Sequence, residues 1–430
     1  MWVSILEGSF TFTFMTWTSG AVLIGYLLAL GAGPRTLAAV ASMPMLVQLF
    51  SPAMSWWAAR RKRRLVYMQV VTGLGRGLWV FAIVLPWLPP LGIPPALLLV
   101  ALVGLSGLLQ SGVGPAWISL MGDVVPDKIR GSYFGLRNGI LGIVAMVASV
   151  AAGLYLDRTA APGNFQMVLF VSVCFALVGI VMYGWHYDPP HVQPDLSLWE
   201  SIRTPLRDRA FRRFLGFSMY WNAAVLLGSP FVIPYFLKHL GMTFTQVAIW
   251  SAISAICTFG TAPLWGRLAD QVGHKTVLTI TSILAGTALP ACWLIARPGW
   301  LAFIWISSVM DSLSWGGANT SLFNMGLNAA PVRYRMSYLA ILGAAGGITG
   351  CIAALASGPL LELFTPWTFA LGDYQWTGYH TLFVISAAMR AFAWRLLRGI
   401  PEPPRRPLGE VLREFAQRGV SLLPRIGPNA

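Results

Sequence analysis

The amino-acid sequence predicts an all-α polytopic membrane protein with twelve transmembrane helices in two six-helix bundles. Three observations lead to this prediction. The composition is strongly apolar, long apolar segments recur along the whole chain, and each half of the chain contains one copy of the pattern Pro-x-x-x-Arg-x-Ser-Tyr, at residues 126–133 and 331–338.

The composition indicates that lipid is the solvent for most of the apolar surface. Of the 430 residues, 56% are hydrophobic and 10% are charged, whereas a soluble domain carries about 25% charged residues. A protein core alone cannot hide this much apolar surface. Apolar segments of about 18 residues or more, each long enough to cross a bilayer core of roughly 30 Å, occur throughout the chain.

Each apolar segment is expected to be an α-helix, because unpaired backbone groups are too costly in lipid. Gly and Pro interrupt the chain in short connectors such as GAGPR at residues 31–35 and ARPGW at residues 296–300, as is typical of helix boundaries. The predicted spans lie near residues 4–30, 36–58, 65–87, 96–122, 131–156, 164–185, 212–237, 245–265, 276–296, 300–326, 337–364 and 380–398.

These spans divide the chain into an N-terminal bundle (residues 1–185), a cytoplasmic linker (186–211), a C-terminal bundle (212–398) and a cytoplasmic tail (399–430). Apolar residues at helical spacing predict an amphipathic segment on the inner membrane surface in the linker and another in the tail. A partner-binding helix is the alternative for the tail. The apolar residues are Leu198, Ile202, Leu206 and Phe211 in the linker, and Leu408, Val411, Leu412 and Phe415 in the tail.

The net charge of +15 could indicate nucleic-acid binding, but the placement of the 30 Lys and Arg residues argues for membrane topology instead. Loops on one side carry most of them, including residues 60–64, Arg137 and, on the approach to the tail, Arg390. This asymmetry predicts a multi-pass protein of the cytoplasmic (inner) membrane with both termini in the cytoplasm. No nucleic-acid partner is expected. The opposite loops carry Arg35, Arg158, Lys238 and Arg297, and Arg76 falls inside a span.

The sequence predicts no disulfide, metal site or cofactor. The four cysteines stand singly in apolar segments, with no CxxC motif and no partner histidine. Met43, Met45 and Met54 could bind a soft metal such as Cu(I), but their irregular spacing favours core packing. The first segment lacks a basic start and a cleavage site, so it is expected to be a retained span. The cysteines are Cys174, Cys257, Cys292 and Cys351.

The two octapeptides fall in equivalent turns, between the fourth and fifth helix of each half, which predicts two parallel six-helix repeats with a substrate site between them. The turn GRLADQVGHK (residues 266–275) matches the signature loop of the major facilitator superfamily, and the chain resembles that family over essentially its full length. The resemblance implies alternating access between two rocking bundles without identifying the cargo. In the first half, Ala59 and Lys62 replace the Asp and Gly of the signature, and the fifth helix lacks the Gly-Pro pattern of antiporters.

The resemblance also implies that helices 1, 4, 7 and 10 line the substrate cavity. Polar residues in these helices recur at spacings of three, four and seven, which places each set on one helical stripe. Close helix packing is the alternative role for the Ser and Thr residues. The stripes comprise Glu7, Thr11 and Thr18; Ser106, Gln110 and Trp117; Ser218, Trp221, Asn222 and Ser229; and Ser308, Asp311, Ser314, Trp315 and Asn319.

Three charged residues in the spans are candidates for chemistry. Asp311 lies roughly 16 Å into helix 10, where a carboxylate costs about 3 kcal/mol. One hypothesis is that Asp311 carries the coupling proton or contacts a cationic substrate. The alternative is a neutral carboxyl group hydrogen-bonded to neighbouring serines. Arg76 is expected to bind an anionic substrate or to pair structurally with a neighbour. Glu7, near the start of helix 1, is expected at solvent or headgroup level and is a weaker coupling candidate.

Asp270 in the signature loop is a candidate gating residue. A carboxylate in a turn can meet the positive N-terminal end of a facing helix, and Arg130, just before helix 5 of the opposite half, offers a second partner. The hypothesis is a latch between Asp270 and Arg130 or helix 5 that closes the cytoplasmic side, with a solvated loop Asp as the alternative. The other residues assigned to gating are Gly266, Gly273, Lys275 and Arg335.

The expected function is secondary active transport of a small organic solute, with a proton as the coupling ion and a monomer as the working unit. A facilitative uniporter and a drug or metabolite efflux protein are alternatives within transport. A membrane-embedded lipid-modifying enzyme is the alternative from another class. Because such an enzyme needs clustered carboxylates or basic residues at one membrane face, and the acids here are dispersed, no enzymatic activity is expected.

Overall fold

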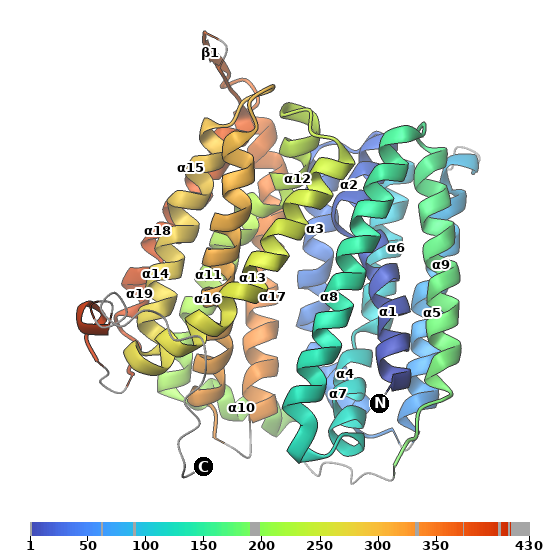
Figure 1. Ribbon diagram of the computed structural model, residues 1–430, viewed down its shortest axis with the longest axis vertical. Helices are drawn as coiled ribbons and strands as arrows, with labels where there is room; N and C mark the ends of the chain where they lie inside the picture. Colours follow the sequence, from blue (N-terminus) through green and yellow to red (C-terminus); the bar gives the residue numbers. More distant parts are fainter. Residues whose placement is uncertain are drawn as a thin grey trace.

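The computed structural model describes residues 2–61, 63–88, 92–189, 198–331, 335–372, 374–402, 406–411 and 413. Two bundles of long helices stand side by side, one built from each half of the chain (Figure 1). The start of α1 lies toward one end of the molecule, which we call the N-terminal end. We call the other end, where the β1 strand projects, the hairpin end.

Ten helical elements form the N-terminal bundle. Three predicted spans are interrupted: the first at Gly20, which has a φ of +54°, the second near Pro52 and the fourth at Gly112. The elements are α1 (Trp2–Trp17), α2 (Gly20–Ala29), α3 (Pro34–Leu49), α4 (Ser51–Ala59), α5 (Arg64–Val84), η1 (Leu85–Trp87), α6 (Pro95–Gln110), α7 (Val113–Val124), α8 (Asp127–Arg158) and α9 (Gly163–Tyr183).

The second half begins with the linker helix and repeats the sequence of long helices. Its elements are α10 (Leu198–Arg207), α11 (Arg209–Gly228), η2 (Ser229–Phe231), α12 (Val232–Pro234), η3 (Tyr235–His239), α13 (Phe244–Val272), α14 (His274–Gly286), α15 (Ala288–Ile295), α16 (Ala302–Ala329), α17 (Arg335–Phe364), β1 (Phe369–Leu371), β2 (Tyr374–Trp376), α18 (Gly378–Phe392) and α19 (Trp394–Leu397).

The helices coincide with the predicted spans. Among the described residues, nine helices are long and apolar enough to cross a membrane, or ten if the bent pair α3 and α4 counts as one span. The remaining two predicted spans correspond to α16 and to α18 with α19. The prediction of an all-α, twelve-helix fold in two bundles is therefore confirmed.

The most extensive contacts between the halves are those of α3 with α17 and of α8 with α13, and smaller ones join α4 to α17 and α2 to α13. Glycines let these helices approach closely. A Cβ atom added at Gly347 of α17 would lie 2.6 Å from the carbonyl oxygen of Met45 on α3, and one added at Gly153 of α8 would lie 2.8 Å from the backbone of Thr245 on α13. Any side chain at these two glycines would push the halves apart.

Among the described residues, the buried apolar side chains that join the halves lie at the hairpin end. One cluster spans both halves and includes Tyr26, Phe165, Phe231 and Leu361. Toward the N-terminal end, the buried residues instead form separate clusters, each confined to one half. Helices α8 and α13 accordingly lie side by side at the hairpin end and diverge toward the N-terminal end (Figure 1). The interface is thus closed at one end.

One feature differs from the sequence predictions. The connector before the last span contributes two short antiparallel strands, with Phe369 opposite Trp376, where no strand was predicted. The linker is helical, with Ile202 and Phe211 packed into the core of the C-terminal bundle and Trp199 and Leu206 exposed. Its placement on the inner membrane surface stays a prediction.

The amphipathic helix predicted in the tail is described only in part, and its place on the membrane surface stays a prediction. In its described part, Leu408 and Val411 pack against Val272 and Val277, beside the turn between α13 and α14. The other two apolar residues of the predicted tail helix, Leu412 and Phe415, lie outside the described residues.

Candidate functional site

A polar cluster lies inside the N-terminal bundle. The Thr11 hydroxyl on α1 donates to Oε1 of Glu7 at 2.6 Å, and Arg76 on α5 donates from Nη2 to Thr11 at 3.2 Å and from Nε to Gln110 on α6 at 3.3 Å. Gln110 in turn donates to the Ser106 hydroxyl at 3.0 Å. Residues from three of the predicted spans are thereby connected into one network.

The environment of Glu7 corrects the sequence-based expectation. Glu7 is 2% exposed and not at solvent level, and the buried Tyr183 at the end of α9 interacts with it electrostatically. The bundle surrounds Glu7 because α1 packs between α8 and α9. The position of Glu7 near the start of the first predicted span could not show this burial.

Arg137 is a second buried arginine of this cluster, which the sequence analysis placed among the loop residues. It is 7% exposed, donates from Nε to the hydroxyl of Ser4 at 3.2 Å, and stacks over the Trp117 ring at 4.2 Å. Its Nη2 atom lies 2.7 Å from where a Cβ of Gly8 would be. The absence of a side chain at Gly8 therefore admits the guanidinium beside α1.

A second cluster lies inside the C-terminal bundle. The Ser254 hydroxyl on α13 donates to Oδ2 of Asp311 on α16 at 2.7 Å. Arg390 on α18 is 2% exposed and interacts electrostatically with Asp311. Arg390 was expected among the basic residues that approach the tail, whereas the structure places it inside α18.

The other predicted cavity residues differ in environment. Trp221 is buried against Trp315, with ring centroids 5.9 Å apart, and the Thr18 hydroxyl donates to a carbonyl of its own helix at 2.7 Å. The Asn222 amide also bonds within its helix, at 2.9 Å. Asn319 is exposed. Substrate contact by these four residues stays a prediction.

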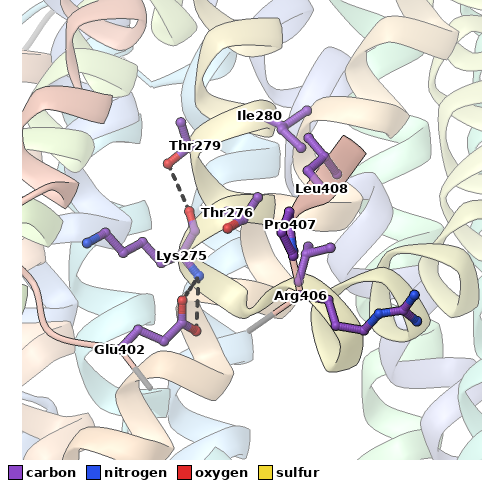
Figure 2. A pocket seen from close by; sticks show the side chains of 9 residues that line it. Lys275, Thr276, Thr279, Ile280, Glu402, Arg406, Pro407 and Leu408 are labelled. Carbon is purple, nitrogen blue, oxygen red and sulfur yellow. Dashed lines mark hydrogen bonds between the residues drawn. The ribbon is translucent and has the colours of Figure 1, made fainter. Parts of the chain in front are cut away.

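The signature loop contacts the C-terminal segment of the same half (Figure 2). Gly273, between α13 and α14, has a φ of +91°, which favours glycine. The Glu402 carboxylate accepts hydrogen bonds from the backbone N–H groups of His274 at 2.7 Å and Lys275 at 3.1 Å. Lys275 Nζ donates to the carbonyl of Ile400 at 2.9 Å. The described residues 398–402 and 406–411, which we call the C-terminal strap, contact this turn.

Asp270 is exposed at the end of α13 and lines a cavity of about 550 Å³ within its own half, together with Phe214, Asn328 and Pro401. The side chains of Arg130 and Arg335 lie outside the described residues. A Cβ added at Gly266 would meet nothing within 4 Å. The latch between Asp270 and helix 5 therefore stays a prediction.

The described polar contacts between the halves lie at the hairpin end. Asp157 at the end of α8 accepts hydrogen bonds from the backbone N–H groups of Phe244 and Thr245, at 2.8 and 2.9 Å. Arg35 and Glu362 form an ion pair at 2.8 Å. The sequence analysis missed both contacts. A signal for the first was available in the pattern Thr-x-x-Gln at residues 243–246, which is typical of a helix N-terminus.

No group of three His, Cys, Asp or Glu residues within the described part of the chain could hold a metal ion.

Two helical bundles that meet tightly at one end, each with a buried polar network, define a membrane transport protein. The family model of the Major Facilitator Superfamily matches residues 6–232 and 213–425, and the chain belongs to this family. The resemblance based on the signature loop is thus confirmed.

Solved structures share this fold at low sequence identity. A mutant of the nucleoside transporter NupG aligns with a TM-score of 0.71 and 15% identity, covering 93% of this chain and 99% of that chain. A POT family transporter in complex with a thioalcohol-conjugated peptide aligns with a TM-score of 0.67 and 14% identity, covering 97% and 95%. A D-xylose-proton symporter aligns with a TM-score of 0.65 and 14% identity, covering 93% and 97%. No curated protein matches the chain.

Proposed function

We propose that this protein is a secondary active transporter that moves a small organic solute across the cytoplasmic membrane by alternating access, coupled to protons through Asp311. The observation that carries the proposal is the environment of Asp311 on α16, which accepts a hydrogen bond from Ser254 on α13 and interacts electrostatically with the buried Arg390 on α18. The family and fold point to a transporter rather than an enzyme.

The asymmetric interface supports alternating access. Shared core residues and the Asp157 contacts join the halves at the hairpin end, while the cores are separate toward the N-terminal end. The basic residues concentrate in loops at the N-terminal end, which the positive-inside rule assigns to the cytoplasm. The described conformation is then closed to the outside. A latch between Asp270 and helix 5 is proposed for the opposite conformation, in which the cytoplasmic side closes.

A proton on Asp311 would change the packing of the C-terminal bundle. The ionised carboxylate attracts the buried Arg390 guanidinium, and the neutral acid does not. Because an unpaired charge in the interior is costly, protonation favours a rearrangement of α18 relative to α16. Substrate binding in the polar interior and this rearrangement together would link solute movement to proton movement.

The test uses purified protein in liposomes that contain a pH-sensitive dye, with sugars, nucleosides, amines and organic acids supplied outside. At least one solute class should drive proton flux. Asp311→Asn should abolish that flux while solute exchange across the membrane continues, and Glu410→Gln, which removes an exposed carboxylate in the tail, should leave both unchanged.

Other results of this transport assay would reject the coupling role of Asp311 or identify a different mode of transport. Full proton-coupled flux in Asp311→Asn would remove the coupling role from this residue. Solute movement without proton movement would identify a facilitative uniporter, and the direction of net movement would separate uptake from efflux.

A further inference from the structure

The buried charges of the N-terminal bundle do not balance. Arg76 is 4% exposed and Arg137 is 7% exposed, and Glu7 is the buried carboxylate beside them. The third buried arginine of this bundle, Arg64, is paired with Asp123 at 2.6 Å and Asp188 at 3.1 Å. In the other bundle, the charge of Arg390 is opposed by that of Asp311, with which it interacts electrostatically. Within the described residues, one unit of buried positive charge in the Glu7 cluster is left without a counter-charge.

The hydrogen bonds of the cluster are also incomplete. Arg76 donates hydrogen bonds to the neutral groups of Thr11 and Gln110, and its Nη1 atom is buried without a hydrogen-bond partner. The indole N–H of Trp117, beneath the Arg137 guanidinium, is likewise buried and unpartnered. Two unfilled donors beside an uncompensated charge are costly to bury. A bound anion would remove both costs at once.

We propose that the Glu7–Arg76–Arg137 cluster binds the carboxylate group of an anionic solute. This inference rests on the proposed transport function and deepens it by naming the class of cargo. A single negative charge balances the cluster, whereas a dianion would leave an excess negative charge and an amine would add to the positive one. Guanidinium groups match carboxylates through paired N–H donors.

The neighbouring rings indicate the shape of the solute. Arg76 lies 5.1 Å from the Phe14 ring centroid and Arg137 lies 4.2 Å from that of Trp117, so flat apolar surfaces flank both guanidinium groups. Thr11, Gln110 and Trp117 are partly exposed and come from α1, α6 and α7, which gives the cluster a partly accessible side. A planar monocarboxylate, such as an aromatic acid, fits these surfaces.

The experiment measures thermal unfolding of the purified full chain in detergent with benzoate or with benzamide, which has the same shape and no charge. Ionic strength is matched with sodium chloride. Benzoate should raise the unfolding temperature in a saturable way, and benzamide should not. Arg76→Gln should weaken benzoate binding about tenfold or more, because it removes a charged hydrogen bond. Arg76→Lys, which keeps the charge, should retain part of the response. Arg158→Gln, at an exposed arginine, is the matched control.

A charge test covers the case in which benzoate is too small a probe. Glu7→Gln raises the net buried charge of the cluster from one to two positive charges. The unfolding temperature without ligand should therefore fall, and the increase in unfolding temperature that a monocarboxylate causes should become larger. Equal shifts by benzoate and benzamide would overturn the proposal. The proposal would also be overturned if benzoate, nicotinate and pyruvate all failed to shift the unfolding temperature while both Arg76 variants unfolded at a lower temperature. Arg76 would then have a structural role.

Failure of this inference and failure of the transport function are distinguishable. Asp311→Asn should keep the full benzoate response, because Asp311 lies in the other bundle. A benzoate response without any solute movement in liposomes would support the anion site and reject the transport function.

Discussion

Asp157, the penultimate residue of α8, is hydrogen-bonded to the backbone N–H of Phe244, the first residue of α13, at 2.8 Å. The two residues belong to different halves of the chain. The second carboxylate oxygen accepts from the backbone N–H of Thr245 at 2.9 Å. A carboxylate of one bundle therefore caps a helix of the other, and it does so at the end where the hydrophobic core is shared.

Asp157→Asn should loosen this closed end. The substitution removes a negative charge from a helix N-terminus, which is worth about 0.3–1 kcal/mol at an exposed site, so the open fraction should rise about two- to fivefold. Spin labels at the exposed positions Ala160 and Lys238 would report the distance between the halves. Arg158→Gln, one residue further along, should leave the distance distribution unchanged. An unchanged distribution in Asp157→Asn would mean that the cap does not contribute to closure.

The ion pair between Arg35 and Glu362 should contribute much less. The side chains are 74% and 37% exposed, and exposed pairs are typically worth under about 1 kcal/mol. A double-mutant cycle with Arg35→Gln and Glu362→Gln, followed by thermal unfolding, should give a small coupling energy that decreases with added salt. A large coupling energy that salt does not change would contradict this expectation.

Gly347→Ala should separate α17 from α3. The new Cβ would lie 2.6 Å from the Met45 carbonyl oxygen, and relieving such a contact costs typically 1–3 kcal/mol. Gly343→Ala, one helical turn earlier, is the matched control because a Cβ there meets nothing within 4 Å. It should be neutral or stabilising by about 0.5–1 kcal/mol. Thermal unfolding of both variants checks the prediction, and equal unfolding temperatures would show that the contact is not needed.

Gly273→Ala should release the C-terminal strap from the signature loop. Its φ of +91° is unfavourable for alanine by about 1–3 kcal/mol, and the added Cβ would lie 2.6 Å from the Glu402 carboxylate. Hydrogen exchange of the backbone N–H groups of His274 and Lys275 should therefore accelerate. Gly266→Ala, in the same loop but without a close neighbour, should leave this exchange unchanged. Wild-type protection in Gly273→Ala would argue against the strap contact.

The helices could be predicted from the sequence because insertion into lipid depends on each segment by itself. The segment predicted at residues 164–185 corresponds to α9, Gly163–Tyr183, and the signature loop indicated the family. The hairpin at residues 369–376 was missed because two three-residue strands carry little periodicity, and their formation depends on local pairing.

The polar residues were harder to place. Stripe spacing put Thr11 and Gln110 on the predicted cavity faces of two helices, but it could not show that both residues share a hydrogen-bond network with Arg76. Arg137 and Arg390 were assigned to loops on the basic side of the membrane. The positive-inside rule predicts the side on which a basic residue lies, but it does not show whether that residue is buried. Their burial depends on neighbours from distant parts of the chain: Ser4 and Trp117 for one, Asp311 for the other.

Hydrophobicity and the signature loop are properties of individual segments, so the amino-acid sequence was enough to predict two related sets of membrane-spanning helices. Which charges lie near one another became clear from the folded structure alone. Burial of Glu7 beside two arginines, the electrostatic interaction of Asp311 with Arg390, and closure at the Asp157 end all require side chains from separate helices to share one volume. Helix packing sets those distances, and no pattern within a single segment encodes them.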